Sequence, residues 1–443
     1  MRRLTIIGCV LAALVAGAAP AAASDAEVVE FEAVGDTTFE LNDRRYRGPL
    51  EVVVYSDGLA VVEEIPLDTY LSGIREVPFS WPEAALQAQV VAARTYLAWT
   101  LARGRSETGQ AHGYDICATS ACQVYAGIEA VEGRDGDRWL SAIETTSGEI
   151  LVHEGAPAQA LYSSSAGSRT RSVQDVWDSA PISYLQAVDS PEAGVTPFEE
   201  WVVDLPEDVF ISVLAAGGYD VGSPVSAVAV VGPPEGGGRS QLRVESPNGA
   251  TSIVMSDVKG VFNRYGDDLF PGLLPAQAPS GRRWPQAIPS YTFDAQLEAA
   301  PQAPAPTLAE YLPPSDLPPA ARIVITGEGW GHQIGMSQYG AKAMADLGYA
   351  YDEIVSHYYT GLAPEDAGEL VPEIVRVGLT WGQSELTIAA SGPFLVKANG
   401  KPLGAVSGGQ WEVRLTPGGV AMVPADPTVR TPLGPGPGSQ WPR

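Results

Sequence analysis

The stretch LSGIREVPFSWPEAALQAQVVAARTYLAWTLARG, residues 71–104, predicts two helices with a carboxylate at the break between them. The first helix is expected to end near Val77, because Pro78 disfavours a helical conformation in the residue before it. Glu76 then lies at a helix C-terminus, whose partial negative charge disfavours an anionic side chain by about 0.3–1 kcal/mol. Burial beside Phe79 and Trp81 would also raise the pKa of Glu76.

Two interpretations of Glu76 stay open on these residues alone. A carboxyl group whose pKa is raised towards neutrality holds its proton, as a general acid requires. A surface glutamate paired with Arg75 or Arg94 would instead have a lowered pKa and no role in catalysis.

The second helix is the most apolar part of the stretch. It begins with an S-x-x-E capping pattern formed by Ser80 and Glu83, with Pro82 in the first turn, and stops at Gly104. Apolar residues at helical spacing form one long stripe: Leu86, Val90, Ala93, Leu97 and Leu101. We therefore expect this helix to face the core.

The composition limits the classes of partner. The chain has 443 residues, with 27 basic and 53 acidic side chains and a net charge of −26. Hydrophobic residues make up 45% and charged residues 18%, which is typical of a globular protein. Nucleic acid and anionic membrane surfaces are poor partners for so acidic a chain. A local basic cleft is still compatible with this overall charge.

The first 24 residues have the pattern of an export signal. A short cationic start precedes the apolar residues 4–19, and Ala21-Ala22-Ala23 offers a small-residue cleavage site. A lipid anchor at Cys9 is less well supported, because almost no apolar stretch precedes that cysteine. No later segment reaches the roughly 18 consecutive apolar residues of a membrane span. We therefore expect a signal peptide at 1–24, an exported mature chain and no membrane span in it.

Two cysteines remain after such cleavage, Cys117 and Cys122. In an oxidising compartment they are expected to form a disulfide. The alternative is a zinc site with His112 as a third ligand. That site lacks the CxxC spacing of common zinc sites and has no obvious fourth ligand apart from Asp115.

The expected fold class is α+β, with small mixed β-sheets, a few helices that form a groove, and flanking β segments. Residues 25–58 show strand patterns separated by turns, and 59–363 form the central α+β domain. Within it, 271–319 hold twelve prolines and are expected to run largely as an extended surface excursion, although IPSYTFDAQLE fits a strand. Residues 364–425 are expected to form a C-terminal β appendage, and 426–443 a disordered tail.

Several well-known catalytic motifs are absent from the sequence: HExxH, GxxxxGK, GxGxxG after a strand, and GxSxG. His332, in GWGHQIGMSQYGA, lies where a strand is expected to turn into a helix. The glycines around it let a ligand approach the backbone closely. The alternative for His332 is a buried structural histidine bonded to the backbone.

Four segments resemble the SpoIID/LytB family, that is, the stage II sporulation protein D domain and its amidase-enhancer relatives: YLSGIREVPFSWPEAALQAQVVAARTY, ACQVYAG, LYSSSAGSRTRSVQDVW and GWGHQIGMSQYGAKAMADLGYAYDEIVSHYYTG. The resemblance covers about residues 60–362. It implies a peptidoglycan lytic transglycosylase that needs no cofactor. Such enzymes cut between N-acetylmuramic acid (MurNAc) and N-acetylglucosamine (GlcNAc) and leave a 1,6-anhydro ring. The family's Glu-Met-Pro is Glu76-Val77-Pro78 here, so Glu76 is the implied general acid and base.

The same resemblance implies a substrate groove around Glu76. Its residues would be Arg94, Tyr96, Gln123, Tyr125, Tyr162, Ser163, Ser165, Thr170, Trp177, His332 and Gln338. Arg94 falls near the apolar stripe of its helix, so the alternative is a buried structural arginine. Free lactyl carboxylates of peptide-stripped glycan would suit Arg94, Arg169 or Arg171.

Two alternatives to the enzyme stay open. The LytB side of the resemblance implies a wall-binding protein that enhances an N-acetylmuramoyl-L-alanine amidase. A passive wall-binding scaffold that uses the β appendage is the other. The implied partners are peptidoglycan glycan strands and, for the enhancer, a cell-wall amidase. The implied location is secreted or associated with the cell wall, and a sporulation role does not follow from the domain alone.

Overall fold

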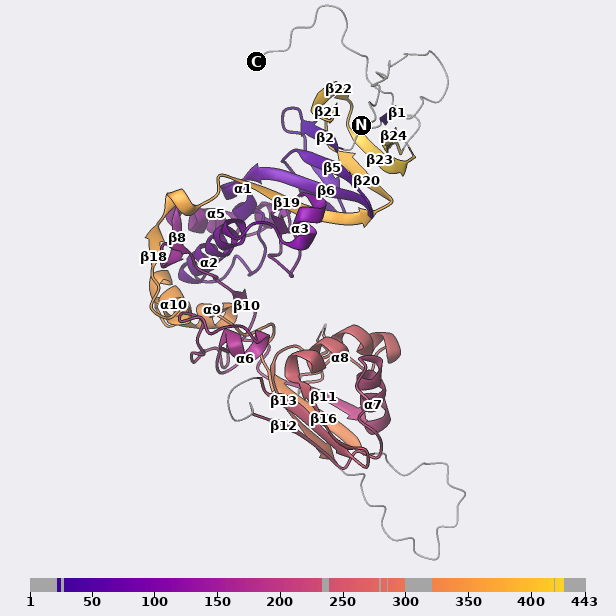
Figure 1. Cartoon of the computed structure of the whole chain (residues 1–443). Coiled ribbons are helices and arrows are strands. Elements are labelled where there is room, and N and C mark those ends of the chain that lie inside the picture. Colours follow the sequence, from indigo (N-terminus) through magenta and orange to yellow (C-terminus); the bar gives the residue numbers. More distant parts are fainter. Residues whose placement is uncertain are drawn as a thin grey trace, which may run out of the picture.

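The computed structural model is an α+β fold, as the sequence predicts. It describes residues 22–24, 28–232, 239–278, 280–284, 286–298, 321–417 and 419–425. Residues 1–21 of the expected signal peptide and the expected tail at 426–443 lie outside the described residues. Within the described part of the chain, no helix is long and apolar enough to cross a membrane. Figure 1 shows a β-rich part, a helical part and a second α+β part that follow one another along the molecule.

The β-rich part joins strands from both ends of the chain. Its strands are β1 (Ala22–Ser24), β2 (Val28–Ala33), β3 (Phe39–Leu41), β4 (Arg44–Tyr46), β5 (Leu50–Tyr55), β6 (Gly58–Pro66), β7 (Ile116–Cys117), β19 (Ile374–Gln383), β20 (Glu385–Ala390), β21 (Phe394–Ala398), β22 (Lys401–Val406), β23 (Gly409–Thr416) and β24 (Gly419–Pro424). They form a seven-stranded sheet, β22-β21-β2-β5-β6-β19-β7, and a six-stranded sheet, β1-β24-β23-β20-β3-β4. Segments expected at opposite ends, 25–58 and 364–425, therefore share both sheets.

Apolar side chains on the inner faces of these sheets explain the pairing, because alternate residues of a strand point to the same side. Phe31, Phe39 and Phe394 are fully buried, and their ring centroids lie between 5.6 and 6.3 Å apart. The N-terminal and C-terminal strands thus complete one core.

The helical part is built around α2 (Glu83–Ala102). The predicted stripe of Leu86, Val90, Ala93 and Leu97 is fully buried, but so are Ala88, Val91 and Ala92 on other faces of the helix. The helix therefore runs through the centre of this part, in contact with α5, α9 and α10. The helices here are α1 (Leu67–Ser72), α3 (Glu107–His112), α4 (Glu129–Glu132), α5 (Gly136–Thr145), α6 (Val173–Trp177), α9 (Gln338–Asp346), α10 (Tyr351–Tyr358) and the short η1 (Gly368–Leu370), and the strands are β8 (Glu149–His153), β9 (Ala156–Pro157), β10 (Tyr162–Ser163), β17 (Met336–Ser337) and β18 (Pro364–Asp366).

Two expectations about helix ends are wrong. Helix α1 ends at Ser72 rather than near Val77, because Gly73 caps it and the chain continues in an extended conformation. The capping pattern of Ser80 and Glu83 is not used, since α2 begins at Glu83 with Pro82 as its N-cap. Ser80 lies instead in a turn that is closed by a hydrogen bond from the Trp81 N–H to the Pro78 carbonyl, 3.1 Å.

The described residues of the range 201–298, together with 321–328, form the second α+β part, which we call the α7–α8 lobe. Its elements are β11 (Trp201–Pro206), α7 (Glu207–Ala216), β12 (Ala227–Val231), β13 (Gln241–Ser246), β14 (Gly249–Val254), α8 (Met255–Leu269), β15 (Thr292–Glu298) and β16 (Arg322–Glu328). The strands make two three-stranded sheets, β11-β16-β15 and β12-β13-β14. Both helices pack on these sheets around one core.

The beginning of the proline-rich stretch belongs to this core. Leu274, Trp284 and Ile288 are buried there, and β15 pairs with β16, as the strand pattern of IPSYTFDAQLE allows. The described residues of the range 271–298 are therefore not the extended surface excursion that the prolines suggested, because apolar side chains among them are buried. Residues 299–320 lie outside the described residues.

Candidate functional site

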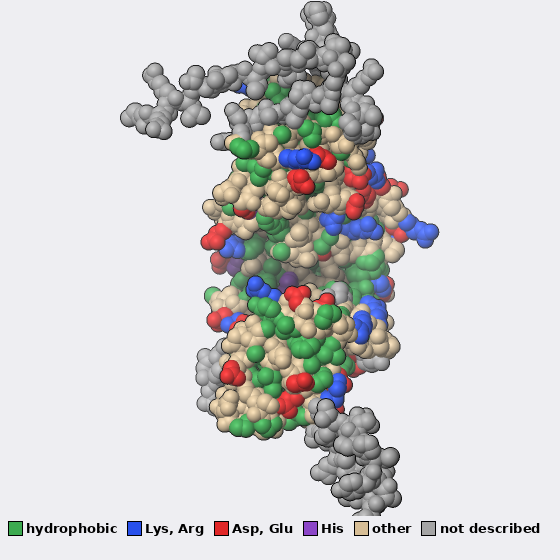
Figure 2. All heavy atoms as spheres, turned by 90° about the vertical axis from the view of Figure 1, so that its right-hand side faces the viewer, with side chains coloured by type: hydrophobic (Ala, Val, Ile, Leu, Met, Phe, Trp, Pro, Cys, Tyr) green, Lys and Arg blue, Asp and Glu red, His purple; other side chains and the backbone are tan. Residues whose placement is uncertain are grey.

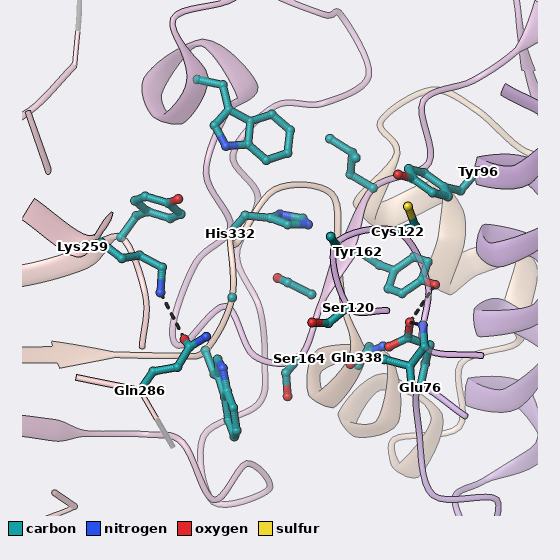
Figure 3. A pocket seen from close by; sticks show the side chains of 18 of the residues that line it. Glu76, Tyr96, Ser120, Cys122, Tyr162, Ser164, Lys259, Gln286, His332 and Gln338 are labelled. Atoms are coloured by element: carbon teal, nitrogen blue, oxygen red, sulfur yellow. Dashed lines mark hydrogen bonds between the residues drawn. The ribbon is translucent and has the colours of Figure 1, made fainter. Parts of the chain in front are cut away.

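A cavity of about 640 Å³ lies between the helical part and the α7–α8 lobe, at the level where the space-filling view is hollowed (Figure 2). This volume is typical of ligand-binding sites in proteins. The lining residues come from segments far apart in the sequence (Figure 3). They are Arg75, Glu76, Tyr96, Ser120, Ala121, Cys122, Val124, Leu161, Tyr162, Ser163, Ser164, Trp177, Lys259, Gln286, Tyr291, Trp330, Gly331, His332 and Gln338.

Glu76 stands in an extended segment that follows α1. Ile74 forms an antiparallel bridge with Tyr125, and the Arg75 N–H donates to the Val124 carbonyl at 2.9 Å. The carboxyl group of Glu76 continues this pairing, because its Oε1 accepts a hydrogen bond from the Val124 N–H at 2.6 Å. The helix-terminus effect inferred from the sequence does not apply here, since three residues separate Glu76 from the end of α1.

Burial nevertheless raises the pKa of Glu76. Hydrogen bonds from the Val124 N–H, the Gln338 side chain and the Tyr162 hydroxyl act in the opposite direction, in that order, and do not cancel the effect of burial. No arginine contributes to this shift, so Glu76 is not the ion-paired surface glutamate of the second interpretation. The Val124 N–H and the Tyr162 hydroxyl both donate to Oε1, at 2.6 and 3.4 Å.

A hydrogen-bond chain behind the cavity fixes the hydroxyl group of Tyr162. The fully buried Gln123 donates from Nε2 to that hydroxyl at 2.9 Å and to the Ala93 carbonyl at 3.2 Å. Its Oε1 accepts from the Tyr70 hydroxyl at 2.7 Å. Because the Tyr162 oxygen accepts from Gln123, its own proton is free to point at Glu76.

His332 lies at the wall of the cavity with its ring beside Trp177, and the two ring centroids are 5.3 Å apart. Its Nδ1 accepts a hydrogen bond from the Ile334 N–H at 3.0 Å. Burial lowers the pKa of His332 to about 4, and the positive charge of Lys259 acts in the same direction. His332 is therefore both bonded to the backbone and exposed to the cavity, and it carries no charge at neutral pH.

Gly331 is the residue that lets this segment approach β10. Its φ is +111°, and a Cβ atom there would lie 2.6 Å from the Cβ atom of Ser163. Any larger residue would push the His332 segment away from the cavity wall.

The wall opposite Glu76 comes from the α7–α8 lobe and carries Lys259 (Figure 3). Its Nζ donates to the Ile288 and Pro289 carbonyls, each at 2.7 Å, and to Gln286 Oε1 at 3.3 Å. Burial lowers the pKa of Lys259 to about 7. No local pattern in the sequence pointed to Lys259, because a single lysine in a helix is normally a solvated side chain.

The structure separates the residues implied by the resemblance into two groups. Six line the cavity with Glu76: Tyr96, Tyr162, Ser163, Trp177, His332 and Gln338. Five are buried outside its lining: Arg94, Gln123, Tyr125, Ser165 and Thr170. Arg169 pairs with Asp189, and the Arg171 backbone bridges to Ile334, so neither arginine lines the cavity.

Arg94 is a structural arginine, which is the alternative that its place near the apolar stripe suggested. Its Nη1 donates to the Thr146 and Glu149 carbonyls at 2.6 and 3.1 Å, and its Nη2 to the Ile143 carbonyl at 3.3 Å. Burial lowers its pKa to about 10. The guanidinium group ties α2 to the end of α5 and the start of β8.

The other buried residues hold loops in place. The Tyr125 hydroxyl donates to Glu63 at 2.7 Å, and the Thr170 hydroxyl accepts from the Val188 N–H at 2.8 Å. The Ser165 hydroxyl accepts from the Thr196 hydroxyl at 3.1 Å. These contacts support the cavity from behind.

Cys117 and Cys122 are joined in a disulfide, with their Cα atoms 5.5 Å apart. The bridge closes the loop that leads into Val124, so it also stiffens the partner of Glu76. His112, the third ligand of the zinc alternative, bonds to Asp57 at 2.9 Å and to the Thr108 carbonyl at 3.0 Å. In the described ranges, no group of three or more His, Cys, Asp or Glu residues is placed to hold a metal ion.

Comparison with known proteins gives a consistent result. Residues 55–153 match the sequence model of the family described as stage II sporulation protein, SpoIID. Stage II sporulation protein D of Bacillus amyloliquefaciens is 26% identical over 330 residues, which are 72% of this chain and 80% of the relative. An uncharacterized protein of Brachyspira hyodysenteriae is 26% identical over 329 residues, which are 73% of each chain.

The amidase enhancer of Bacillus subtilis is 28% identical over 312 residues, which are 65% of this chain and 38% of that longer relative. The segment that matches the family model contains Glu76, α2 and the disulfide loop. Residues 55–153 therefore match the SpoIID domain family, and the chain is related to proteins named stage II sporulation protein D and amidase enhancer.

Proposed function

We propose that the protein is an exported lytic transglycosylase, which cleaves peptidoglycan glycan between MurNAc and GlcNAc and leaves a 1,6-anhydro-MurNAc end. The observation that carries the proposal is that Glu76 is the only acidic side chain among the described residues that line the cavity. Burial raises its pKa, so the group can hold a proton for a leaving oxygen. The match of residues 55–153 to the SpoIID family model is compatible with this reaction.

A single carboxyl group suits an intramolecular reaction. Most glycosidases use two carboxyl groups, because the second attacks the sugar or activates a water molecule. Formation of an anhydro ring needs no second group, since the 6-hydroxyl of MurNAc is the nucleophile. Glu76 gives its proton to the glycosidic oxygen as the bond from C1 to that oxygen breaks. The 6-hydroxyl oxygen then bonds to C1 and returns its proton to Glu76, so that no water is consumed.

The groups around Glu76 match its two states. When Glu76 has given up its proton, the Val124 N–H and the Tyr162 hydroxyl stabilise the carboxylate by hydrogen bonds to Oε1. When Glu76 is protonated, burial favours the neutral form. The protein therefore stabilises both the ionised and the protonated form of Glu76.

The remaining lining suits an acidic sugar polymer. Aromatic faces that can stack on sugar rings come from Tyr96, Trp177, Tyr291 and Trp330. The cations that line the cavity are Arg75 and Lys259, although the chain as a whole has a net charge of −26. A local positive potential of this kind attracts an anionic ligand. The export pattern at 1–24 and the SpoIID relationship support a location outside the cytoplasm, at the cell wall.

The proposal is tested with the mature chain and glycan strands from which an amidase has removed the peptides. Mass spectrometry should detect 1,6-anhydro-MurNAc products with the wild type, and Glu76→Gln should lower their rate of formation by about 10²–10⁴-fold. Glu83→Gln is the matched control, because Glu83 is an exposed residue in the first turn of α2. Absence of anhydro products with the wild type would refute the catalytic proposal.

A second candidate function is enhancement of an amidase without catalysis. It is supported by the 28% identity with the amidase enhancer of Bacillus subtilis. In that case both the wild type and Glu76→Gln should increase peptide release by a purified N-acetylmuramoyl-L-alanine amidase acting on intact walls. An increase that depends on Glu76 would point back to glycan cleavage.

A further inference from the structure

Lys259 is a largely buried cation without an anionic partner. Its ammonium group contacts two backbone carbonyls and one amide oxygen, all of them neutral. No ion pair reaches it from the described residues, whereas Lys342 pairs with Asp346 at 2.6 Å and Lys397 with Glu32 at 2.8 Å. Buried charges in proteins are normally paired. This ammonium group therefore lacks the counter-ion that such a position usually has.

The Lys259 side chain is accessible from the cavity, so a ligand anion can reach it there. Lys259 lines the cavity from the wall opposite Glu76 (Figure 3). The Tyr291 ring centroid lies 5.5 Å from the Lys259 Nζ. The charge of Lys259 contributes to the lowered pKa of His332, which also lines the cavity and is neutral at neutral pH. No group that lines this side of the cavity in the described structure competes for the ammonium group as an anion.

The contacts of Lys259 divide into a fixed pair and an adjustable one. The Ile288 backbone is clamped by Asn263, which accepts from its N–H at 2.8 Å and donates to its carbonyl at 3.0 Å. The carbonyls of residues 288 and 289 therefore hold the ammonium group in place. The third contact, to Gln286 Oε1, is longer at 3.3 Å and involves a side chain that also lines the cavity.

Rotation of the Gln286 side-chain amide exchanges the positions of its oxygen and its NH₂ group. The NH₂ group then faces the cavity, and the Lys259 N–H that donated to the Gln286 oxygen becomes available to a ligand. An ammonium and an amide N–H side by side can donate to the two oxygens of one carboxylate, as charge-assisted hydrogen bonds require.

We propose that Lys259 and Gln286 form a subsite for a carboxylate of the glycan, namely the free lactyl group of a MurNAc whose peptide has been removed. The identity of the ligand rests on the proposed function, since peptidoglycan supplies this carboxylate. A lactyl group that still carries its peptide is a neutral amide at the same atom and offers no charge to the ammonium group. Lys259 is thus a specificity-determining residue that favours stripped strands over peptide-bearing ones.

The test measures binding in the Glu76→Gln background, so that the ligands are not cleaved. Two MurNAc-containing tetrasaccharides are titrated by calorimetry at pH 6, one with free lactyl carboxylates and one with the same groups converted to methylamides. Glu76→Gln should bind the carboxylate form about 10- to 100-fold more tightly, which is typical of one hydrogen bond to a charged group. Adding Lys259→Met should reduce this ratio to about twofold and leave the affinity for the methylamide form unchanged.

Two further variants separate charge from structure. Adding Lys259→Arg should retain most of the discrimination, because the positive charge is kept. Adding Lys342→Met should leave the ratio unchanged, because Lys342 pairs with Asp346 and does not line the cavity. An undiminished ratio in Lys259→Met would overturn the inference, and so would an equal loss of affinity for both ligands.

The outcome is independent of catalysis. If the wild type forms no anhydro products but the discrimination depends on Lys259, the proposed reaction fails and the carboxylate subsite stands. If anhydro products form and the discrimination does not depend on Lys259, the reaction stands and the subsite fails.

Discussion

Replacement of Arg94 by methionine should destabilise the protein without removing its site. Arg94→Met leaves the carbonyls of Ile143 and Glu149 without this donor, whereas the Thr146 carbonyl keeps the Glu149 N–H as a donor at 3.1 Å. Each orphaned buried group costs about 1–3 kcal/mol, or roughly 4 kcal/mol for two. Removal of a buried cation offsets part of this cost, since the decrease of the Arg94 pKa from 12.5 to about 10 corresponds to about 3 kcal/mol. The expected net loss of stability is about 1 kcal/mol.

Calorimetry and a glycan-binding assay together check this prediction for Arg94. A loss of about 1 kcal/mol lowers the Tm by about 2–4 °C. At a temperature where the variant is still folded, its binding of stripped glycan should equal that of the wild type, because the side chain does not line the cavity. An unchanged Tm with lost binding would show that Arg94 contacts the ligand and would refute the structural assignment.

Glu63, the Cys117–Cys122 disulfide and Tyr162 each allow a further test. Burial raises the pKa of Glu63 to about 7, so the folded state binds this proton more tightly than the unfolded state, and the stability of the wild type falls as the pH rises from about 4.5 to 7. In urea unfolding, the free energy of unfolding of Glu63→Gln should therefore increase by about 3 kcal/mol relative to that of the wild type over this pH interval. A difference between the two proteins that does not change with pH would contradict this prediction. Replacement of Cys117 and Cys122 by serine should lower the free energy of unfolding by about 2 kcal/mol, as expected for so short a loop, and an unchanged urea midpoint would mean that the bridge does not form. Tyr162→Phe removes a donor that favours the ionised form of Glu76. The high-pH limb of the kcat/KM profile for stripped glycan should therefore shift to higher pH, by only about a few tenths of a pH unit because a hydrogen bond of 3.4 Å is weak. A shift to lower pH would contradict the assigned contact.

The lobe arrangement explains why the site needs the whole central region. Glu76 and its hydrogen-bond partners belong to the helical part, whereas Lys259, Gln286 and Tyr291 belong to the α7–α8 lobe. Each wall alone is an open surface. Their juxtaposition creates a cavity with a proton donor on one side and a cation on the other.

Local features of the sequence were sufficient for part of this description. Helix α2 follows from its apolar spacing, because residues three and four apart share one face of a helix. The pairing of Cys117 with Cys122 follows from their closeness in the chain. Glu76 drew attention through the helix break that follows it, although the reason given for its raised pKa was wrong. The helix ends at Ser72, and burial in the folded protein is the actual cause.

Other features depend on residues that are distant in the chain. Strand β6 pairs with β19, about 300 positions later, and such pairing depends on the register of whole strands rather than on any local pattern. The proline-rich residues 271–298 pack because the α7–α8 lobe offers them a core. Prolines fix the backbone but do not decide whether the side chains between them are buried.

The sequence by itself determined the fold class, the central helix, the disulfide candidates and the carboxylate that the proposed reaction requires. Tertiary structure alone decided which polar residues reach the cavity. Hydrogen bonds to three carbonyls hold Arg94 in the protein interior, whereas hydrogen bonds to two other carbonyls hold Lys259 at the cavity. Both are single basic residues on helices, and burial and hydrogen-bond partners are properties of the packed chain that no short stretch of sequence contains.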